Sequence, residues 1–255
     1  MLVRTLLVTL PLLWACDGPP PPAAEGTTSA PRAQPSATTS AASKPAPKKR
    51  KTAAECPTGP VVTIDDTTLE AAIRKQLRQP VGDIQREDLA KVVTLDLSQA
   101  PANDELDPCV YPHLTGMTAL YLAPGKLDDI SVLAKLTKLE SLRVAATAVK
   151  DLKPLAKLTK LDRLDVGRTP VADLKPLTEL THLTHLMLDE TEVTDLTPLS
   201  KLTRLTVINI KRTRVKDLAP LKGLTKLKNL YIEGSAVTDT APLAGLKGLH
   251  IHQAK

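Results

Sequence analysis

The sequence has 255 residues, but it contains no phenylalanine and only 2% aromatic residues. Leucine must therefore supply most of the core, which argues against an ordinary mixed globular domain. The formal charge of the whole chain is +6. Residues 17–55 carry six cations and three carboxylates, a net charge of +3, and Arg4 adds one more positive charge. Residues 56–255 therefore carry a net charge of only +2. This balance and the lack of aromatic residues argue against nucleic-acid binding, which needs a basic face and stacking surfaces.

Residues 1–15 have the features of an export signal. Arg4 precedes an apolar stretch at residues 6–14, which is too short for a comfortable membrane span of about 20 residues. The end of the segment, Leu13-Trp14-Ala15-Cys16, resembles a bacterial lipobox, although Trp14 is bulkier than the usual residue there. The resemblance implies cleavage before Cys16 and lipid on its thiol, which would anchor the protein to a membrane of the cell envelope. Ordinary secretion and an uncut anchor are the alternatives.

Residues 16–55 predict a disordered tether. The stretch is rich in Pro, Ala, Ser and Thr and has almost no large apolar residue, so burial cannot offset the entropy cost of folding it. It contains the basic run Lys48-Lys49-Arg50-Lys51. The simplest interpretation of this run is a group of solvated charges, and attraction to anionic lipid or an envelope polymer is the alternative.

Residues 56–91 predict a helical cap. A helix is expected over residues 68–78, because three apolar residues fall on one helical face: Leu69, Ile73 and Leu77. Thr67 and Glu70 have the spacing of a capping box before this helix, and Pro80 follows it. Residues 86–91 form a second short segment of the cap.

Two cysteines remain once Cys16 is assigned to lipid. Cys56 and Cys109 lie at the edges of the cap in an exported chain, so we expect a disulfide between them. It would close a loop of 53 residues and join the cap to the first repeat. Catalytic thiols and a metal site are the alternatives, but no motif surrounds either cysteine.

Residues 92–255 contain a repeat of 22 residues. The spacing is constant for five aspartates: Asp151, Asp173, Asp195, Asp217 and Asp239. Within one unit, Leu161, Leu164, Val166 and Val171 combine a strand-like alternation with a turn. Further leucines return on the far side of the coil, where Pro176 favours a tight 3₁₀-like segment. One coil therefore closes every 22 residues.

These columns resemble the leucine-rich-repeat family, specifically the 22-residue class of bacterial internalins, over residues 89–249. The resemblance implies an α/β-type solenoid: a right-handed coil with parallel strands on the concave face, 3₁₀ and extended segments on the convex face, and a small helical N-terminal cap. The family's Asn at relative position 9 is replaced by hydroxyl residues, which should keep a weaker ladder of bonds to the turn. This column reads Thr147, Thr169, Thr191, Thr213 and Ser235.

The same resemblance implies a binding surface at relative positions 3, 5 and 7, which point out of the concave sheet. These positions differ from coil to coil and offer both charge signs together with Met and Tyr, which suits a protein partner, with an envelope polymer as the other option. The candidate binding residues are Arg143, Arg163, Asp165, His185, Met187, Asp189, Asn209, Lys211, Tyr231 and Glu233.

Metal binding and catalysis have weaker support. The aspartate column offers too few oxygen ligands per coil for calcium and is well placed to accept backbone N–H bonds. His182 and His185 flank the inward Leu183, whereas His250 and His252 lie in a terminal segment expected to fray, so their metal-like spacings do not indicate a site. Because no nucleophile elbow, Cys-His motif or phosphate loop is present, we expect neither an enzyme nor a cofactor.

The C-terminal end shows no cap after a strand that begins at Leu249, so its exposed edge could stack on another chain. The sequence thus favours a membrane-anchored leucine-rich-repeat protein that binds another macromolecule, most readily a protein, through its concave face. The alternative is a structural envelope protein that self-associates or spaces a complex through its solenoid.

Overall fold

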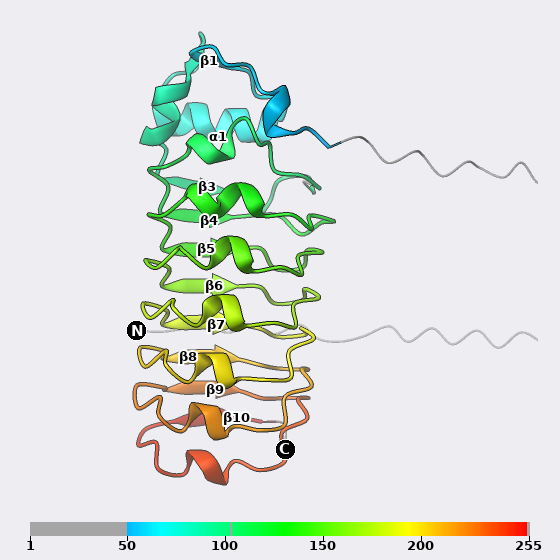
Figure 1. Cartoon of the computed structure of the whole chain (residues 1–255), viewed down its shortest axis with the longest axis vertical. Helices are drawn as coiled ribbons and strands as arrows, with labels where there is room; N and C mark the ends of the chain where they lie inside the picture. Colours follow the sequence, from blue (N-terminus) through cyan, green and yellow to red (C-terminus); the bar gives the residue numbers. More distant parts are fainter. Residues whose placement is uncertain (1–49, 103, 254–255) are drawn as a thin grey trace, which may run out of the picture. The chain divides into compact units, whose positions relative to one another are not determined.

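A computed structural model describes residues 50–102 and 104–253 of the chain. The expected export signal, the lipidation of Cys16 and residues 16–49 of the expected tether lie outside these residues. Figure 1 shows the described part as a stack of coils, with strands on one side, short helical turns on the other and the helical cap at the N-terminal end. No helix in this part of the chain is long and apolar enough to cross a membrane.

The strands of the coils form one parallel sheet in which neighbours in sequence are neighbours in space. Each strand has three residues, and its central side chain is the inward leucine or isoleucine of the repeat. Leu142 pairs with Leu164 and Leu164 with Leu186, so the register follows the 22-residue spacing. The strands are β3 Thr94–Asp96, β4 Ala119–Tyr121, β5 Ser141–Arg143, β6 Arg163–Asp165, β7 His185–Met187, β8 Val207–Asn209, β9 Asn229–Tyr231 and β10 His250–His252.

Each coil returns along the opposite side through a 3₁₀ turn, as the proline column predicts. The Asp151 carboxylate accepts the backbone N–H of Lys153 at 2.9 Å, and Asp173, Asp195, Asp217 and Asp239 make the same bond two residues on. This confirms the structural interpretation of the aspartate column. The turns are η3 Tyr111–His113, η4 Ser131–Lys135, η5 Lys153–Leu155, η6 Lys175–Leu177, η7 Thr197–Leu199, η8 Ala219–Leu221 and η9 Ala241–Leu243.

The core is a continuous stack of aliphatic side chains, nearly all of them leucines, valines and isoleucines with almost no solvent exposure. The hydroxyl column lies at its edge. Thr169 Oγ1 donates to the carbonyl of Val166 at 2.6 Å, and Thr147, Thr191 and Thr213 make the equivalent bond. The hydroxyls therefore bond to the turn backbone, as expected, while backbone groups link the coils: Arg168 N–H donates to Asp189 O at 2.6 Å.

The cap consists of the helix α1 Thr67–Leu77, the turn η2 Arg86–Lys91 and a short antiparallel pair, β1 Val61–Val62 with β2 Ile84–Gln85. The expected capping box is wrong by one residue, because Asp66 and not Thr67 caps the helix. Asp66 Oδ1 accepts the N–H groups of Thr68 and Leu69 at 2.8 and 3.1 Å. A carboxylate can accept two such bonds, and its negative charge interacts favourably with the positive end of the helix dipole.

The described part of the chain begins before the expected tether ends. Residues 50–55 lie on the cap and include the turn η1 Ala53–Glu55. Arg50 binds Asp128 through Nη2 at 2.6 and 2.8 Å, and Lys51 Nζ lies 3.3 Å from carboxylate oxygens of both Asp65 and Asp107. The structure therefore places residues 50–55 in the folded domain and not in the expected tether, and both cations, although partly exposed, have carboxylate partners there.

The expected disulfide is present. Cys56 and Cys109 are joined with an S–S distance of 2.06 Å and a Cα–Cα distance of 5.3 Å. The bond ties the chain just after η1 to the residue just before the buried Val110 and Tyr111. It therefore links the start of the cap to the first coil, as expected.

The last described coil is one residue shorter than the 22-residue coils before it. Ile251 pairs with Leu230, an offset of 21 residues, and Gly248 takes a positive φ of 77° before the strand. A shift of one residue reverses which side chains face the core. His250 and His252 thus join the outward face of β10, and the expectation of a frayed segment there is wrong.

Candidate binding face on the concave sheet

The strand register brings the expected concave residues together in rows. Arg143, Asp165, Met187, Asn209 and Tyr231 are paired partners along β5 to β9, so their side chains lie one above another. The row continues into Tyr121 on β4 and His252 on β10, neither of which was among the sequence candidates. The constant spacing could have found Tyr121, whereas the shortened last coil hid His252.

A second row contains Arg163 and His185. It also includes Val207 and Asn229, which the sequence candidates omitted although the repeat spacing places them there. The residues at relative position 7, Asp189, Lys211 and Glu233, follow the strands on the same side of the repeat. Gly167 also lies in this third row, and a Cβ there would come 2.6 Å from Asp189 Oδ1, so a larger residue would displace the Asp189 carboxylate.

The first charged pair on this face joins β5 to β6. Arg143 Nε lies 3.3 Å from Asp165 Oδ2, and Asp165 Oδ1 accepts the N–H of Gly167 at 3.0 Å. Burial raises the pKa of Asp165 above its ordinary value, although the Gly167 bond and Arg143 oppose this. Burial thus disfavours the charged form of this carboxylate, whereas Arg143 favours it. A cationic group of a partner would stabilise the charged form further.

The middle of the face is polar around one apolar side chain. Thr184 Oγ1 lies 2.7 Å from His185 Nδ1 and donates to Asp162 at 2.6 Å. Asn209 donates to Asp189 at 3.0 Å. Met187 lies half-buried between these groups on β7. A flexible thioether of this kind adapts to the shape of a partner surface.

The most elaborate cluster lies on the last two strands. The rings of Tyr231 and His252 stack with centroids 4.2 Å apart and planes 13° apart. Lys211 Nζ lies 5.0 Å from the Tyr231 ring centroid and 3.1 Å from Glu233 Oε1, and His252 Nε2 lies 3.1 Å from Asn229 Oδ1. The cluster thus presents a stacked aromatic pair beside one cation and one carboxylate.

Glu233 has one carboxylate oxygen in use and one without a partner. Its Oε2 atom is buried and accepts no hydrogen bond from the described residues. Burial raises the pKa of Glu233, but its own backbone N–H and Lys211 outweigh that effect, so the pKa is lowered overall. The side chain therefore stays ionised, and its buried Oε2 atom is an acceptor without a partner among the described residues.

A shallow hollow of about 470 Å³ lies beside this cluster, lined by Asp189, Glu190, Lys211, Arg212, Glu233 and Gly234. Arg212 Nη1 binds Glu190 Oε1 at 2.8 Å across its rim. The lining is charged and contains both signs. It suits the uptake of a polar partner segment better than that of an apolar small molecule.

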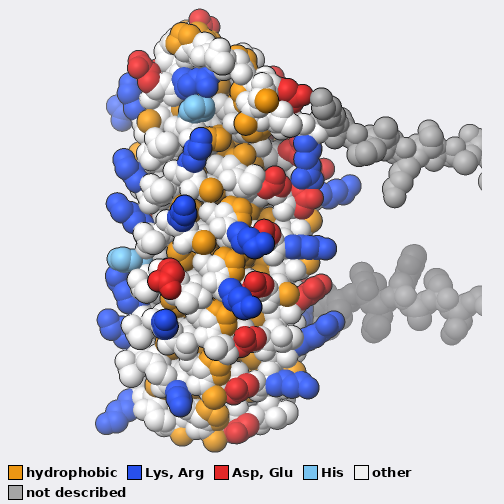
Figure 2. Space-filling view, viewed as in Figure 1, with side chains coloured by type: hydrophobic (Ala, Val, Ile, Leu, Met, Phe, Trp, Pro, Cys, Tyr) orange, Lys and Arg blue, Asp and Glu red, His pale blue; other side chains and the backbone are white. Residues whose placement is uncertain are grey.

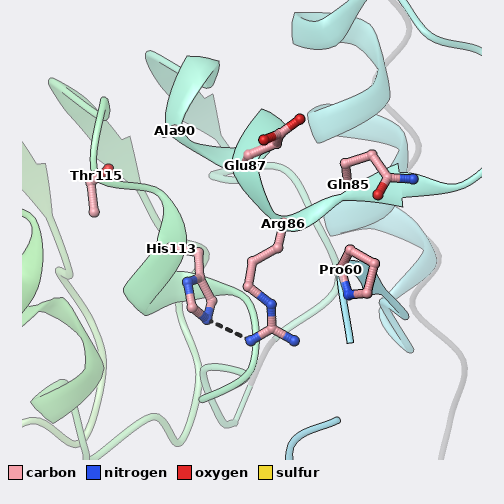
Figure 3. Close-up of a pocket in the computed structure, with 7 residues that line it drawn as sticks. All are labelled: Pro60, Gln85, Arg86, Glu87, Ala90, His113 and Thr115. Atoms are coloured by element: carbon pink, nitrogen blue, oxygen red, sulfur yellow. Dashed lines mark hydrogen bonds between the residues drawn. The ribbon is translucent and has the colours of Figure 1, made fainter. Parts of the chain in front are cut away.

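A second hollow lies at the cap, and Figure 3 shows Arg86 and His113 pointing toward each other within it. Arg86 donates to the carbonyls of Pro57 and Gly59 and lies 3.1 Å from His113 Nε2. Burial, then the charges of Arg86 and Lys135, lowers the pKa of His113. The Arg86 side chain is thus fully used within the protein, and its bonds to Pro57 and Gly59 attach the cap to the chain that follows Cys56.

The histidines considered for metal binding do not come together in the fold. His182 is exposed at the edge of the solenoid, whereas His185 bonds to Thr184 on the concave face. Across residues 50–102 and 104–253, no three His, Cys, Asp or Glu side chains are grouped so that they could hold a metal ion.

Comparison with known proteins places this geometry among leucine-rich-repeat structures. An internalin (inlF) from Listeria monocytogenes superposes with a TM-score of 0.66 at 28% identity, over 73% of this chain and 55% of the internalin. Internalin C2 (inlC2) from the same species gives a TM-score of 0.65 at 25% identity, over 74% of this chain and 93% of that one. The chain therefore spans about half the length of the first of these relatives and nearly all of the second.

A plant receptor, solved as a complex, shows the same fold. The leucine-rich-repeat ectodomain of the membrane receptor kinase GASSHO1/SCHENGEN3 from Arabidopsis thaliana, in complex with CASPARIAN STRIP INTEGRITY FACTOR 2, superposes with a TM-score of 0.56 at 20% identity, over 63% of this chain and 21% of that one. No protein-family model matches the sequence, and no curated protein matches it. The described chain has the leucine-rich-repeat solenoid fold, and its parallel sheet and 3₁₀ turns resemble those of internalins.

Proposed function

We propose that this protein is a cell-envelope binding module that recognises a protein partner through its concave face. The observation that carries the proposal is the contrast between the two sides of each coil. The 3₁₀ side repeats the same Asp-Leu-x-Pro pattern, because closing the coil demands it, whereas the concave rows change from coil to coil. A surface free to vary is what recognition of one particular partner requires.

The composition of the concave face favours a protein partner. Protein interfaces are enriched in Tyr, Met and Arg, and a few such residues carry most of the binding energy. Tyr231 with His252 and Lys211 offers an anchor of this type, and Arg163 and Met187 lie on neighbouring strands. The plant receptor complex supports the choice, since that leucine-rich-repeat ectodomain was solved with its ligand bound.

The central experiment replaces Arg163, Met187, Lys211 and Tyr231 by Ala together. None of these side chains belongs to the leucine stack, so the circular dichroism should change little, and loss of the Tyr231–His252 stack should loosen β10 alone. A photo-crosslinking amino acid at position 209 should capture a partner protein in intact cells, and the fourfold variant should lose this adduct. A matched control changes four residues of the 3₁₀ side, Lys150, Lys175, Thr197 and Lys216, to Ala and should keep it. An adduct retained by the concave variant and lost by the control would contradict the proposal.

The envelope location rests on residues 1–16, where the segment resembling a lipobox ends at Cys16. Lipid chains contribute about 0.8 kcal/mol per buried CH₂, so acylation at this thiol would hold the protein on a membrane without a spanning helix. Cys16→Ser should abolish fatty-acid labelling and move the protein to the soluble fraction. Labelling that persists in this variant would contradict lipidation at Cys16.

Self-association is the second candidate function. Among the described residues β10 pairs only with β9, and Leu249 and Ile251 are only partly buried at this end. An unpaired parallel edge can add a strand from another chain. Native size measurement distinguishes the candidates, because stacking through β10 predicts a dimer or filament of the isolated protein, whereas a binding module stays monomeric until its partner is added.

A further inference from the structure

We propose that one edge of the solenoid is a second binding surface, distinct from the concave face, for a linear acidic polysaccharide. The surface, here called the basic edge, is formed by the segments that lead from each 3₁₀ turn into the next strand. These segments are residues 134–138, 156–160, 178–182, 200–204 and 222–226. Together they carry eight Lys or Arg residues and a single carboxylate, Glu179.

Seven of the eight cations of the basic edge lie in two columns, each interrupted at the coil of residues 178–182. The strand pairing aligns residues 22 apart, and adjacent strands are about 4.8 Å apart, so equivalent residues recur at this rise. One column consists of Lys138, Lys160, His182, Arg204 and Lys226. Figure 2, which faces the 3₁₀ turns, shows a vertical row of basic side chains with one His along the left side of the molecule. The length of this row therefore increases with the number of coils.

The cations of the basic edge are not paired with carboxylates of the described residues. Its Lys and Arg side chains are exposed, and none of them forms an ion pair with a described carboxylate. On the other side of the 3₁₀ turns, residues 150–153, 172–175, 194–197 and 216–219 carry four Lys and four Asp, so the charge there is balanced. The near-neutral total for residues 56–255 thus conceals a segregation of charge. Like charges in columns repel, and a polyanion would relieve that repulsion.

Exposed hydroxyls lie between the cations. In each of these five coils an exposed threonine precedes the basic column by one residue: Thr137, Thr159, Thr181, Thr203 and Thr225. Their hydroxyls form no hydrogen bond with the described residues. The backbone N–H groups of four of them are held by local turns, such as Thr203 N–H to Lys201 O at 2.9 Å. A regular row of free hydroxyls beside cations offers partners for both the hydroxyl and the acidic groups of a sugar chain.

The same features disfavour other polyanions. The five segments contain no Phe, Tyr or Trp on which a nucleobase could stack, and His182 is their single ring. The cations are mostly Lys, which acts as a point charge and lacks the fork with which Arg grips a phosphate. A column of such point charges suits a flexible chain that bears one acidic group at each sugar.

The test measures binding of the full-length chain to polygalacturonate over a range of salt concentrations. Lys138→Gln, Lys160→Gln, Arg204→Gln and Lys226→Gln together should weaken binding by at least about tenfold and flatten its salt dependence, because fewer counterions are released. The matched control, Lys150→Gln, Lys153→Gln, Lys175→Gln and Lys216→Gln, lowers the net charge equally and should bind nearly as the parent does. Equal losses in both variants would overturn the proposal. Replacing Lys138, Lys160 and Lys226 by Arg should preserve binding and shows that the edge tolerates substitution.

Two further arms identify the kind of polyanion. Thr159→Val with Thr203→Val should lower the affinity several-fold while leaving the salt dependence unchanged, since it removes hydroxyls and no charge. Unchanged affinity in this variant would overturn the assignment to a sugar chain. Tighter binding of the parent to oligodeoxythymidine, or to phosphatidylglycerol vesicles, than to polygalacturonate would also overturn it. The fourfold concave variant should bind polygalacturonate normally, so this proposal and the proposed concave site stand or fall separately.

Discussion

The imidazole of His252 lies flat on the ring of Tyr231, with 4.2 Å between the centroids, and so joins the last described strand to the strand before it. His252→Ala should therefore loosen β10 while leaving the central coils unchanged. Hydrogen exchange should become faster at residues 250–252 and stay slow at residues 185–187. His250→Ala, which changes an exposed neighbour on the same strand, serves as the control. Equal protection of β10 in both variants would contradict a stabilising role for the stack.

Leu164→Ala and Leu186→Ala should each lower the free energy of unfolding by about 2–5 kcal/mol, because each removes a fully buried side chain from the leucine stack. Urea titration measures the effect. Leu164→Met, which keeps the volume nearly constant, should cost less than about 1.5 kcal/mol. A midpoint unchanged by the alanine substitutions would contradict the register of the repeat.

Tyr111→Phe should stabilise the protein by about 1 kcal/mol, because the Tyr111 hydroxyl is buried and has no hydrogen-bond partner among the described residues. The same burial raises the pKa of Tyr111. Thermal unfolding measures the change, with Tyr231→Phe as the control at a partly exposed position. A lower melting temperature for Tyr111→Phe would mean that the hydroxyl is satisfied in solution.

The contact between Arg86 and His113 should make stability depend on pH. Burial, helped by Arg86 and Lys135, lowers the pKa of His113 below its ordinary value of 6.5. The unfolded chain thus binds more protons than the folded one, so this contribution is present above pH 6.5 and is lost as the pH falls through the folded pKa. His113→Gln should flatten the fall in melting temperature below pH 6.5, whereas the exposed His182→Gln should not. Parallel pH profiles for the parent and His113→Gln would contradict this assignment.

Loss of the disulfide should cost about 4 kcal/mol, because it closes a 53-residue loop and restricts the unfolded chain. Cys56→Ser with Cys109→Ser should lower the urea midpoint accordingly. Reducing agent should lower the midpoint of the parent to the same value and leave that of the double variant unchanged. A reductant effect on the double variant would show that another group is responsible.

The sequence predicts the repeated parts of this molecule well, since a period of 22 residues fixes the strand register and the leucine stack together. The sequence predicts the structure less well outside the regular 22-residue repeats. His252 was missed because Leu249 continues the leucine spacing, although Gly248 shortens the coil by one residue. Asp66 was missed because Thr67, the next residue, is also a good capping residue. The contact of Arg50 with Asp128 joins residues 78 apart, and no local pattern signals such a pair.

The disulfide also determines how the domain would respond to a mechanical pull on the chain before Arg50. Tension reaching Cys56 passes through the covalent bond directly to Cys109, so residues 57–108, which include α1 and β3, carry none of it. The load then enters the stack beside the buried Tyr111. In an oxidised protein the cap is thus shielded from force, and the coils that follow η3 form the part of the domain that resists extension.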